Sequence, residues 1–384
     1  MRLSLVCIAL VLGGCGIFGR DEPDDPPAEL TEIASSIAVN TAWTARVGET
    51  DPILRLGLQP ASDGSRVFAA AHDGHVAAFD AVTGERAWIT DTDRPLSAGP
   101  AVGDGLVVLG SNDGDLIAID ASTGEIRWHI QVSSEVLAAP AISRGLVVVQ
   151  TVDGLLRGLD AADGSEMWLV EKTVPALSLR GSASPVIAGK TVIAGFSNGE
   201  LVAVDLANGD ELWSVLISPA RGRTVLERLV DINNSVQVVG KDLYVVNFQG
   251  RVAALALESG QVLWTREMSS YRGLSADLAN LYITDQASDI VALDRDVGDP
   301  LWRQEALRNR RLTAPVPFGS AVVVGDLEGY LHWLSPDTGE LIGRARMGQA
   351  SISGRPLVAG NRLFVLSDAG VLSAFEVEPE PDGG

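Results

Sequence analysis

The sequence predicts an all-β protein, an eight-bladed β-propeller with four-stranded blades, and three observations predict it. A unit of fixed length recurs, in which a Gly opens a stretch of alternating residues and a Trp follows 14 positions later, as from Gly74 to Trp88. Successive units begin about 40 residues apart, which is enough for four short strands. No stretch shows a sustained 3.6-residue period, so a helical solenoid is excluded. A fixed-length repeat of this kind is typical of a repeat architecture.

The second copy shows the elements of one unit. Asp113-Gly114 is a turn signal, because Gly tolerates the positive φ that hairpin turns need. Thr123-Gly124 is the second turn signal, and Trp128 lies in the alternating stretch that follows it. Four strands in about 40 residues make one blade. They are expected at residues 99–102, 106–110, 116–120 and 125–132.

Eight central turns predict eight blades. Each central turn lies between the second and third strands of a unit, and in the sixth unit Ser288 stands in place of Gly. In the seventh unit Gly343 replaces the Trp. We number the blades 1 to 8 in the order of their central turns. These turns are at Gly74, Gly114, Gly154, Gly199, Gly250, Ser288, Gly329 and Gly370.

Ring closure accounts for both ends of the repeat. The eighth copy stops before its Trp strand, because the chain becomes acidic and Pro-rich after Val377. Trp43 lies in a strand, residues 39–47, that has no blade before it. We therefore predict that this N-terminal strand fills the outer position of blade 8, which protects sheet edges that could pair with other chains. The predicted propeller spans residues 36–378.

The composition fits a single ring and excludes some partners. The chain has 384 residues, of which 46% are hydrophobic, enough for a buried core between blades. Its formal net charge is −21. So acidic a chain is not expected to bind nucleic acid, nor to bind anionic lipid headgroups by charge.

The N-terminus is predicted to be a processing segment. Arg2 precedes ten apolar residues, 3–12, which are too few to span a bilayer. Leu12-Gly13-Gly14-Cys15 resembles the bacterial lipobox, at which the signal peptide is cleaved before a lipid-modified Cys. The signal peptide is then residues 1–14, and the acylated Cys15 anchors the chain to a membrane. An ordinary secretory cleavage that leaves Cys15 free is the alternative.

The residue after Cys15 predicts the membrane to which the chain is anchored. It is Gly16, not Asp, which favours the periplasmic face of the outer membrane. Residues 15–35 are acidic and Pro-rich and are predicted to be a disordered tether, and residues 379–384 a disordered tail. Cys7 lies in the signal peptide, so no disulfide is predicted within the propeller.

The sequence contains no recognisable catalytic or metal-binding constellation. His72 and His75 flank a turn, and they are expected to be exposed turn residues because no third ligand stands at metal-binding spacing. The Trp residues, one per outer strand, are expected to pack between neighbouring blades. A recurring Asp before the second turn is expected to cap backbone N–H groups. This Asp is Asp80, Asp120, Asp160, Asp205 or Asp294 in its respective blade.

Two consecutive lengthened intervals mark the predicted partner surface. From Trp to the next central turn the baseline is 26 residues, but 31 residues follow Trp168 and 37 follow Trp213. Insertions on a rigid scaffold commonly carry binding residues. These insertions, within residues 174–182 and 219–234, hold leucines, arginines and acids that suit a protein partner, although the leucines could equally fold inward. A third basic cluster, residues 308–311, is predicted to be an exposed loop.

The repeat resembles the tryptophan-docking repeat of the quinoprotein (PQQ) dehydrogenases. Ala78, Asp80, Gly84 and Trp88 fit its A-x-D-x-x-x-G-x-x-x-W pattern. The resemblance implies an eight-bladed periplasmic fold, and a PQQ-dependent oxidoreductase is one alternative function. The cofactor site of that family usually includes a disulfide of adjacent cysteines, and the propeller here has no Cys. We therefore expect no cofactor, no metal and no catalytic residue.

Three strings carry a more specific resemblance. Together with the lipobox and the tether, they resemble the BamB family, the propeller lipoproteins of the outer-membrane β-barrel assembly (BAM) machinery. The resemblance covers essentially the whole chain. It implies a non-enzymatic scaffold that docks on the periplasmic POTRA domains of BamA, joins other BAM subunits and helps deliver unfolded outer-membrane proteins. The strings are Leu177-Ser178-Leu179-Arg180-Gly181, Glu227-Arg228-Leu229-Val230-Asp231 and Gly325-Asp326-Leu327-Glu328-Gly329-Tyr330-Leu331-His332-Trp333.

The same resemblance implies the contact residues. In that family a Leu-x-Leu-Arg loop and an Asp-x-Asp in the next insertion contact the POTRA domains, which assigns Leu177, Leu179, Arg180 and Asp231 to the interface. Asn233 stands where the family has its second acid, and an amide can hydrogen-bond but brings no charge. Exposed edge strands could also take up unfolded client strands by β-augmentation. A propeller that binds another periplasmic protein or a glycan is the remaining alternative.

Overall fold

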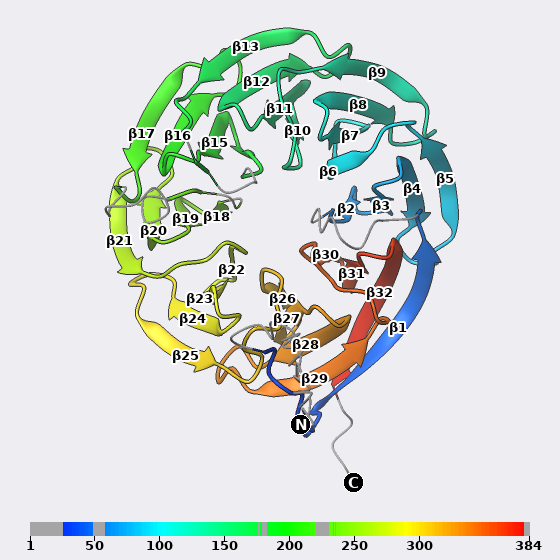
Figure 1. Cartoon of the computed structure of the whole chain (residues 1–384), viewed down its shortest axis with the longest axis vertical. Helices are drawn as coiled ribbons and strands as arrows, with labels where there is room; N and C mark the ends of the chain where they lie inside the picture. The colour runs from blue at the N-terminus through cyan, green and yellow to red at the C-terminus, as the bar shows by residue number, and fades with distance from the viewer. Residues whose placement is uncertain are drawn as a thin grey trace, which may run out of the picture.

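Eight four-stranded sheets form a closed ring in the computed structural model of the protein, which describes residues 26–48, 58–175, 177–178, 183–219, 230–232, 234 and 236–379 (Figure 1). In seven sheets the strands follow one another in chain order, and the eighth has the order β1-β32-β31-β30. Within the described residues, no helix is long and apolar enough to cross a membrane. The predicted eight-bladed all-β propeller is confirmed.

Each blade has its first strand nearest the centre of the ring and its fourth strand at the rim (Figure 1). Blades 1 to 4 consist of β2 (Ala61–Ser62), β3 (Arg66–Ala70), β4 (His75–Asp80) and β5 (Arg86–Asp91); β6 (Leu96–Gly103), β7 (Leu106–Ser111), β8 (Asp115–Asp120) and β9 (Ile126–Gln131); β10 (Ala141–Ser143), β11 (Leu146–Gln150), β12 (Leu155–Asp160) and β13 (Glu166–Glu171); and β14 (Val186–Ala188), β15 (Thr191–Gly195), β16 (Glu200–Asp205) and β17 (Glu211–Leu216). Blades 5 to 8 consist of β18 (Gln237–Val239), β19 (Asp242–Val246), β20 (Arg251–Ala256) and β21 (Val262–Glu267); β22 (Leu274–Ala276), β23 (Asn280–Thr284), β24 (Ile290–Asp294) and β25 (Pro300–Gln304); β26 (Val316–Phe318), β27 (Ala321–Gly325), β28 (Tyr330–Leu334) and β29 (Leu341–Arg346); and β30 (Leu357–Ala359), β31 (Arg362–Leu366), β32 (Val371–Pro379) and β1 (Ile37–Arg46).

The N-terminal strand closes the ring, as predicted. β1 pairs antiparallel with β32, from Ile37 opposite Pro379 to Arg46 opposite Val371. The strand begins two residues earlier than expected from the sequence. Because the two ends of the repeat hydrogen-bond to each other, blade 8 is as complete as the other blades.

The hydrophobic core lies in layers between neighbouring blades. The second and third strands are buried along nearly their whole length, as in β7, where every residue is buried. One layer joins Phe68 and Val76 of blade 1 to Val107 and Leu109 of blade 2. Short aliphatic strands buried on both faces thus read as continuous apolar runs, which is why they were recognisable in the sequence.

Seven indole groups repeat one contact between blades. Each outer-strand Trp donates its Nε1 proton to a carbonyl oxygen of the next blade, as from Trp128 to Ala161 O at 2.9 Å. The expectation that these Trp residues pack between blades is confirmed. The other six bonds run from Trp43 to Ala81, Trp88 to Ala121, Trp168 to Leu206, Trp213 to Leu257, Trp264 to Arg295 and Trp302 to Pro336.

In blade 7 the large and the small residue of one cross-strand pair have changed places. In the other blades the outer-strand Trp lies opposite a small residue of the third strand, as Trp128 lies opposite Ala118. In blade 7 the large residue is Trp333 on the third strand, and Gly343 lies opposite it on the fourth. Trp333 is fully buried and packs edge-on against Phe375 of blade 8. The combined volume of the pair is kept, which explains how this blade tolerates the loss of its outer Trp.

The second turn of five blades, 1 to 4 and 6, is capped by an Asp. Asp80 Oδ1 accepts backbone N–H bonds from Thr83 at 2.7 Å and from Val82 at 2.9 Å. These bonds lower the pKa of Asp80, because they stabilise the carboxylate. Asp120, Asp160, Asp205 and Asp294 make corresponding bonds, so the capping role predicted for these acids is confirmed.

The second turn needs a glycine because the Trp of the preceding blade leaves no space for a side chain there. Gly124 has φ 80°, and a Cβ there would lie 2.8 Å from Cδ2 of Trp88. Gly105 has nearly the same φ, 77°, but a Cβ there meets nothing within 4 Å. Gly124→Ala should therefore lower the free energy of unfolding by about 3 kcal/mol, and Gly105→Ala by about 1 kcal/mol, in urea titrations. Equal losses would mean that the cost comes from φ alone.

Candidate functional site

The lengthened intervals lie at one end of the propeller. Each fourth strand ends beside the central turn of its own blade, because Lys172 N donates to Gly154 O and Ile217 N donates to Gly199 O, both at 3.0 Å. Every interval that leads to the next blade therefore starts at the end that carries the central turns, which we call the central-turn face. The intervals after Trp168 and Trp213 leave this face from two adjacent blades, 3 and 4 (Figure 1).

The first lengthened interval presents an exposed leucine. Leu177 is 41% exposed. Leu179 and Arg180, the other two residues assigned to this loop, lie outside the described residues. The described part of the interval thus projects an apolar side chain toward solvent, as a docking loop requires.

Ion pairs fix the point at which this interval starts. Lys172 Nζ lies 3.2 Å from Glu200 Oε1 and 2.8 Å from Glu211 Oε2, both in blade 4. Burial alone would lower the pKa of Lys172, but hydrogen bonds from its ammonium group to the two carboxylates outweigh burial and raise that pKa. The loop therefore starts from a charged bridge that joins blades 3 and 4.

The second lengthened interval returns into the core. Ile232 is fully buried, and a Cβ added at Gly195 would lie 2.3 Å from its Cγ2 atom. Asp231 is 1% exposed, and its carbonyl oxygen accepts a hydrogen bond from Phe248 N at 3.0 Å. Asn233 lies outside the described residues. Asp231 therefore lies at the base of the loop, between blades 4 and 5, and not at an exposed tip.

The two lengthened intervals differ in what they do with their apolar residues. In the first, Leu177 is exposed; in the second, Val230 and Ile232 are buried. Of the two interpretations that the sequence left open, exposed anchors hold for the described part of the first interval and inward folding for that of the second. Gly195 has no Cβ where Ile232 packs, which is the local reason for the inward folding.

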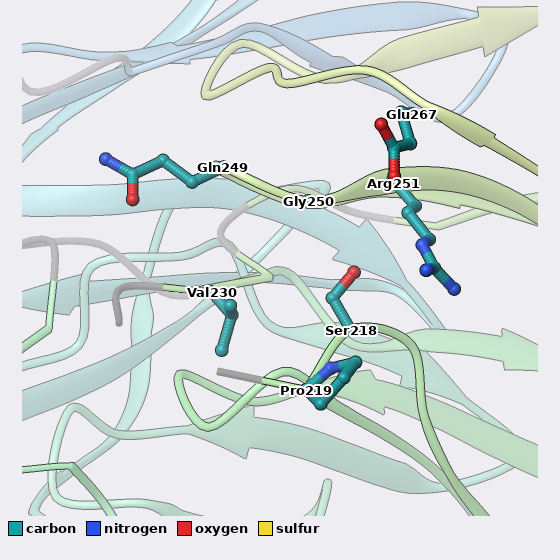
Figure 2. A pocket seen from close by; sticks show the side chains of 7 residues that line it. All are labelled: Ser218, Pro219, Val230, Gln249, Gly250, Arg251 and Glu267. Atoms are coloured by element: carbon teal, nitrogen blue, oxygen red, sulfur yellow. The ribbon is translucent and has the colours of Figure 1, made fainter. Parts of the chain in front are cut away.

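A pocket of about 210 Å³ opens beside the second interval (Figure 2). Ser218 at its wall is 4% exposed, and its hydroxyl has no hydrogen-bond partner among the described residues. Figure 2 shows the guanidinium of Arg251 extending away from the carboxylate of Glu267, although the two residues lie opposite each other in β20 and β21. The lining residues are Ser218, Pro219, Val230, Gln249, Gly250, Arg251 and Glu267.

This pocket could hold a side chain of a protein partner. Pro219 and Val230 supply apolar contact, while Arg251 and Glu267 bring one positive and one negative group. Such a combination of an apolar base and separate charges is typical of positions where a protein anchors a side chain. The sequence analysis did not single out Arg251 or Glu267. Their position beside the central turn at Gly250, where the longest interval ends, was the available signal.

The basic cluster at residues 308–311 is exposed as predicted at Arg308 and Arg311, but it is not exposed at Arg310. Arg310 is only 3% exposed, and its Nε lies 2.8 Å from Asp326 Oδ2, which is fully buried. Arg310 also pairs with Glu328 at the rim of the same site. Arg308 pairs with Asp289 at 2.7 Å, while Arg311 is exposed. Two of the arginines are therefore neutralised within the fold, because buried acids of the central turns of blades 6 and 7 face them.

His332 belongs to the same buried cluster and is neutral. Arg344 Nε lies 3.3 Å from His332 Nδ1, and His332 Nε2 lies 3.0 Å from Asp326 Oδ2. Because Arg can only donate, Nδ1 must accept, and the ring proton is on Nε2, which donates it to Asp326. Burial lowers the pKa of His332, although Asp326 acts in the opposite direction.

Stability should fall on mild acidification because of His332. The folded-state pKa lies below the unfolded value of about 6.5, so the unfolded chain binds the proton first as the pH falls below that value. The loss should reach up to about 1.4 kcal/mol per pH unit between pH 6.5 and the lowered pKa. His332→Gln should make the urea midpoint depend less on pH across this window. An unchanged slope in His332→Gln would contradict the assignment.

His72 and His75 lie at the central turn of blade 1. His72 Nδ1 lies 2.8 Å from Leu96 O, and His75 lies beside Asp73. Within the residues that the structure describes, no group of three or more His, Cys, Asp or Glu side chains could hold a metal ion.

Comparison with known proteins gives consistent matches. The family model described as "Outer membrane protein assembly factor BamB" matches residues 72–304 and 286–379. The chain is 48% identical over 378 residues to the outer membrane protein assembly factor BamB of Alkalilimnicola ehrlichii, covering 98% of this chain and 97% of that protein. It is 46% identical over 374 residues to that of Pseudomonas aeruginosa, covering 97% and 98%.

Solved structures match a BamB protein and, more distantly, a dehydrogenase with the same fold. The crystal structure of BamB from Moraxella catarrhalis matches with a TM-score of 0.81 and 30% identity, covering 88% of this chain and all of that one. A quinohemoprotein alcohol dehydrogenase from Pseudomonas putida HK5 matches with a TM-score of 0.71 but 13% identity, covering 90% and 77%. The second likeness shows a shared fold alone.

Proposed function

The chain belongs to the BamB family of outer membrane protein assembly factors, and from that premise we propose that it is a non-enzymatic scaffold that docks on the POTRA domains of BamA. Its role is that of an outer membrane protein assembly factor. One observation carries this conclusion: identity of 46% to 48% to such factors extends over 97% to 98% of the chain, so the likeness covers the whole propeller and both lengthened intervals.

The central-turn face at blades 3 to 5 is the proposed docking surface. It combines the exposed Leu177, the pocket beside Arg251 and the loop positions Leu179 and Arg180. An apolar anchor next to a guanidinium is the arrangement in which a few residues supply most of the binding free energy. The two lengthened intervals leave the ring next to each other, which supports a single partner that spans both.

Asp231 and Asn233 have a supporting part in this proposal. Because Asp231 is buried at the loop base, we assign to it the positioning of the second interval. Asn233 would reach the partner as a neutral hydrogen-bonding group.

Cys15 is proposed to carry the lipid anchor that holds the protein at the periplasmic face of the outer membrane. The support is the lipobox-like string that ends at Cys15 and the assembly role of the family in that membrane. Metabolic labelling with a fatty acid tests it, since Cys15→Ala should abolish the label on this chain.

We also propose that the protein catalyses no redox reaction. The likeness to quinohemoprotein dehydrogenases is at 13% identity and concerns the fold, and the mature propeller sequence has no Cys to form the disulfide typical of PQQ sites. Added PQQ and calcium should give neither a quinone absorbance nor reduction of an electron-accepting dye. Reduction of the dye would favour the oxidoreductase alternative.

Two outer strands present apolar residues that suit unfolded clients. On the face opposite Trp168, β13 exposes Met167 and Leu169, and β17 likewise exposes Leu212 and Leu216. In β9 the same face carries Arg127 and His129 and is polar. An edge strand with free backbone groups and exposed apolar residues can accept a further strand, so we assign client binding to the edges of blades 3 and 4.

Lysines on this edge should reduce client binding. Met167→Lys/Leu169→Lys places two positive charges on β13, and charged edge residues oppose strand addition. The affinity for an unfolded outer-membrane protein that has been diluted out of urea should fall about tenfold. Arg127→Lys/His129→Lys on β9 is the matched control and should bind as the wild type does. If both variants behave alike, clients do not add at β13.

The decisive experiment for the docking proposal is purification in mild detergent with an affinity tag on this chain. A large β-barrel protein that carries POTRA domains should co-purify. Its absence would contradict docking on BamA and favour another periplasmic protein, or a glycan, as the ligand of this face.

A further inference from the structure

The first described residues of the chain are bound to blade 7 ahead of the first strand. Ala28 N donates to Arg308 O at 2.9 Å, and Arg310 Nη1 donates to Ala28 O, also at 2.9 Å. Arg344 Nη1 donates to Thr31 O at 2.8 Å. Leu30 packs against the core layer between blades 6 and 7. These residues were expected to belong to a disordered tether that ends at residue 35, so contact with the propeller begins earlier than expected.

The segment runs along β29, the outer strand of blade 7, from the central-turn face to the opposite end of the propeller. It starts beside Arg308 in the interval at the central-turn face, and it ends where Ser36 N donates to Ile342 O at 3.0 Å, at the start of β29. β1 then returns along blade 8 to the central-turn face, where Val47 N donates to Gly370 O. Residues 28–36 are called the strap below.

Blade 7 is suited to the strap by the residue that it lacks. Where the other blades have an outer Trp, this blade has Gly343, and a Cβ there would lie 2.8 Å from both Cδ1 and Cγ1 of Ile37. Ile37 is buried and directly follows the strap. A side chain at position 343 would therefore collide with Ile37, so the exchanged Trp333–Gly343 pair leaves room for the first residue of β1, where the strap ends.

The guanidinium groups that hold the strap are themselves held by one buried acid and one buried histidine. Arg310 is oriented by Asp326, and Arg344 by the neutral His332, which also binds Asp326. Each donor therefore points at a strap carbonyl without freedom to turn away. Charge-assisted bonds of this kind are stronger than those between neutral groups.

We infer that the strap fixes the place where the N-terminal tether leaves the propeller: the central-turn face, at the edge of blade 7. The exit point of the tether does not depend on the proposed lipid anchor. Only the orientation of the propeller toward the membrane rests on that proposed function. Eleven peptide units from Cys15 to Pro26 span at most about 40 Å, whereas a released strap would extend that reach to about 75 Å at Ile37. A docked strap thus keeps the face with the two lengthened intervals on the membrane side and within a short distance of it.

Hydrogen exchange followed by mass spectrometry tests the strap on the mature chain in detergent. The amides of Ala28 and Ser36 should exchange far more slowly than those of residues 16–25. Leu30→Ser should raise the exchange of Ala28 about tenfold, because it removes the apolar contact that holds the segment. Leu278→Ser is the control, since Leu278 is 86% exposed, and it should change nothing. A wild-type strap that exchanges as fast as residues 16–25 would overturn the inference, whether or not Cys15 is acylated.

Energy transfer to labelled vesicles tests the orientation separately. A cysteine introduced into the mature propeller is its only thiol, so a dye can be placed on blade 6 at Gln286→Cys, in the central turn, or at Leu278→Cys, at the opposite end. Transfer to headgroup-labelled vesicles should be stronger from Gln286→Cys, and the difference should shrink when Leu30→Ser is added. Equal transfer from both positions would overturn the orientation. A chain that fails to bind vesicles at all would instead contradict the lipid anchor.

Discussion

Asp326→Ala is expected to lower the free energy of unfolding by about 3–5 kcal/mol, because it removes the buried carboxylate that faces the Arg310 guanidinium and leaves only Glu328 at the rim to pair with it. Asp326 is fully buried and also accepts backbone bonds from Glu328 N and Tyr330 N, both at 2.9 Å, which form the central turn of blade 7. Burial alone would raise the pKa of Asp326, but the bond from His332 and the backbone bonds outweigh it and lower that pKa.

Two comparison variants separate the causes of that loss. Asp326→Asn keeps an oxygen for the backbone bonds but removes the charge, so it should recover part of the stability. Asp299→Ala breaks an exposed pair with Arg266, at 2.6 Å, and should cost under about 1 kcal/mol. Urea midpoints at pH 7 give all three values. A loss in Asp326→Ala no larger than in Asp299→Ala would show that the buried cluster does not stabilise blade 7.

Leu179→Ala/Arg180→Ala is expected to weaken binding to the POTRA domains of BamA about 100-fold. One apolar anchor and one guanidinium at the centre of an interface commonly contribute about 1–2 kcal/mol each or more, and about 2.7 kcal/mol in total corresponds to this factor. The propeller should keep its thermal midpoint, because the interval leaves from a base fixed independently by Lys172, Glu200 and Glu211. Titration calorimetry with a soluble POTRA fragment measures the affinity.

The controls for this prediction use the same kind of substitution elsewhere. Leu278→Ala removes a leucine that is 86% exposed, in blade 6 at the opposite end of the propeller, and should leave the affinity unchanged. Asp231→Ala should lower both the affinity and the thermal midpoint, because this carboxylate is buried at the loop base. An unchanged affinity in the Leu179 and Arg180 variant would mean that the first lengthened interval is not the docking loop.

The two lengthened intervals could be located from the sequence. Which of their side chains are buried and which are exposed could not. The constant distance from Gly to Trp exposed the longer intervals after Trp168 and Trp213, since an inserted residue shifts every later position. Whether Leu177 or Ile232 points outward depends on the neighbouring side chains. Gly195 makes room for Ile232, and Gly195 lies 37 positions before it in the chain.

The cluster at blade 7 shows why the prediction of an exposed Arg loop failed at Arg310, although Arg308 and Arg311 are exposed. Three arginines in four positions are normally solvated, because a buried charge without a partner is costly. Asp326 and Asp289 supply those partners from central turns that are 16 and 19 positions away from Arg310 and Arg308. Pairing across such distances depends on which turns meet at one end of the ring.

The ring, its eight blades and its closure by the N-terminal strand could be predicted from the sequence, because they follow from local signals: turn glycines, apolar strands and a Trp at constant spacing. Three features could be seen only in the folded protein: which side chains of the intervals are buried, the exchange of sizes between Gly343 and Trp333, and the binding of residues 28–36 along blade 7. These features arise from contacts between residues far apart in the chain. A repeat encodes each blade separately, whereas the fit between blades and the path of the strap depend on volumes and charges that meet only after the ring has closed.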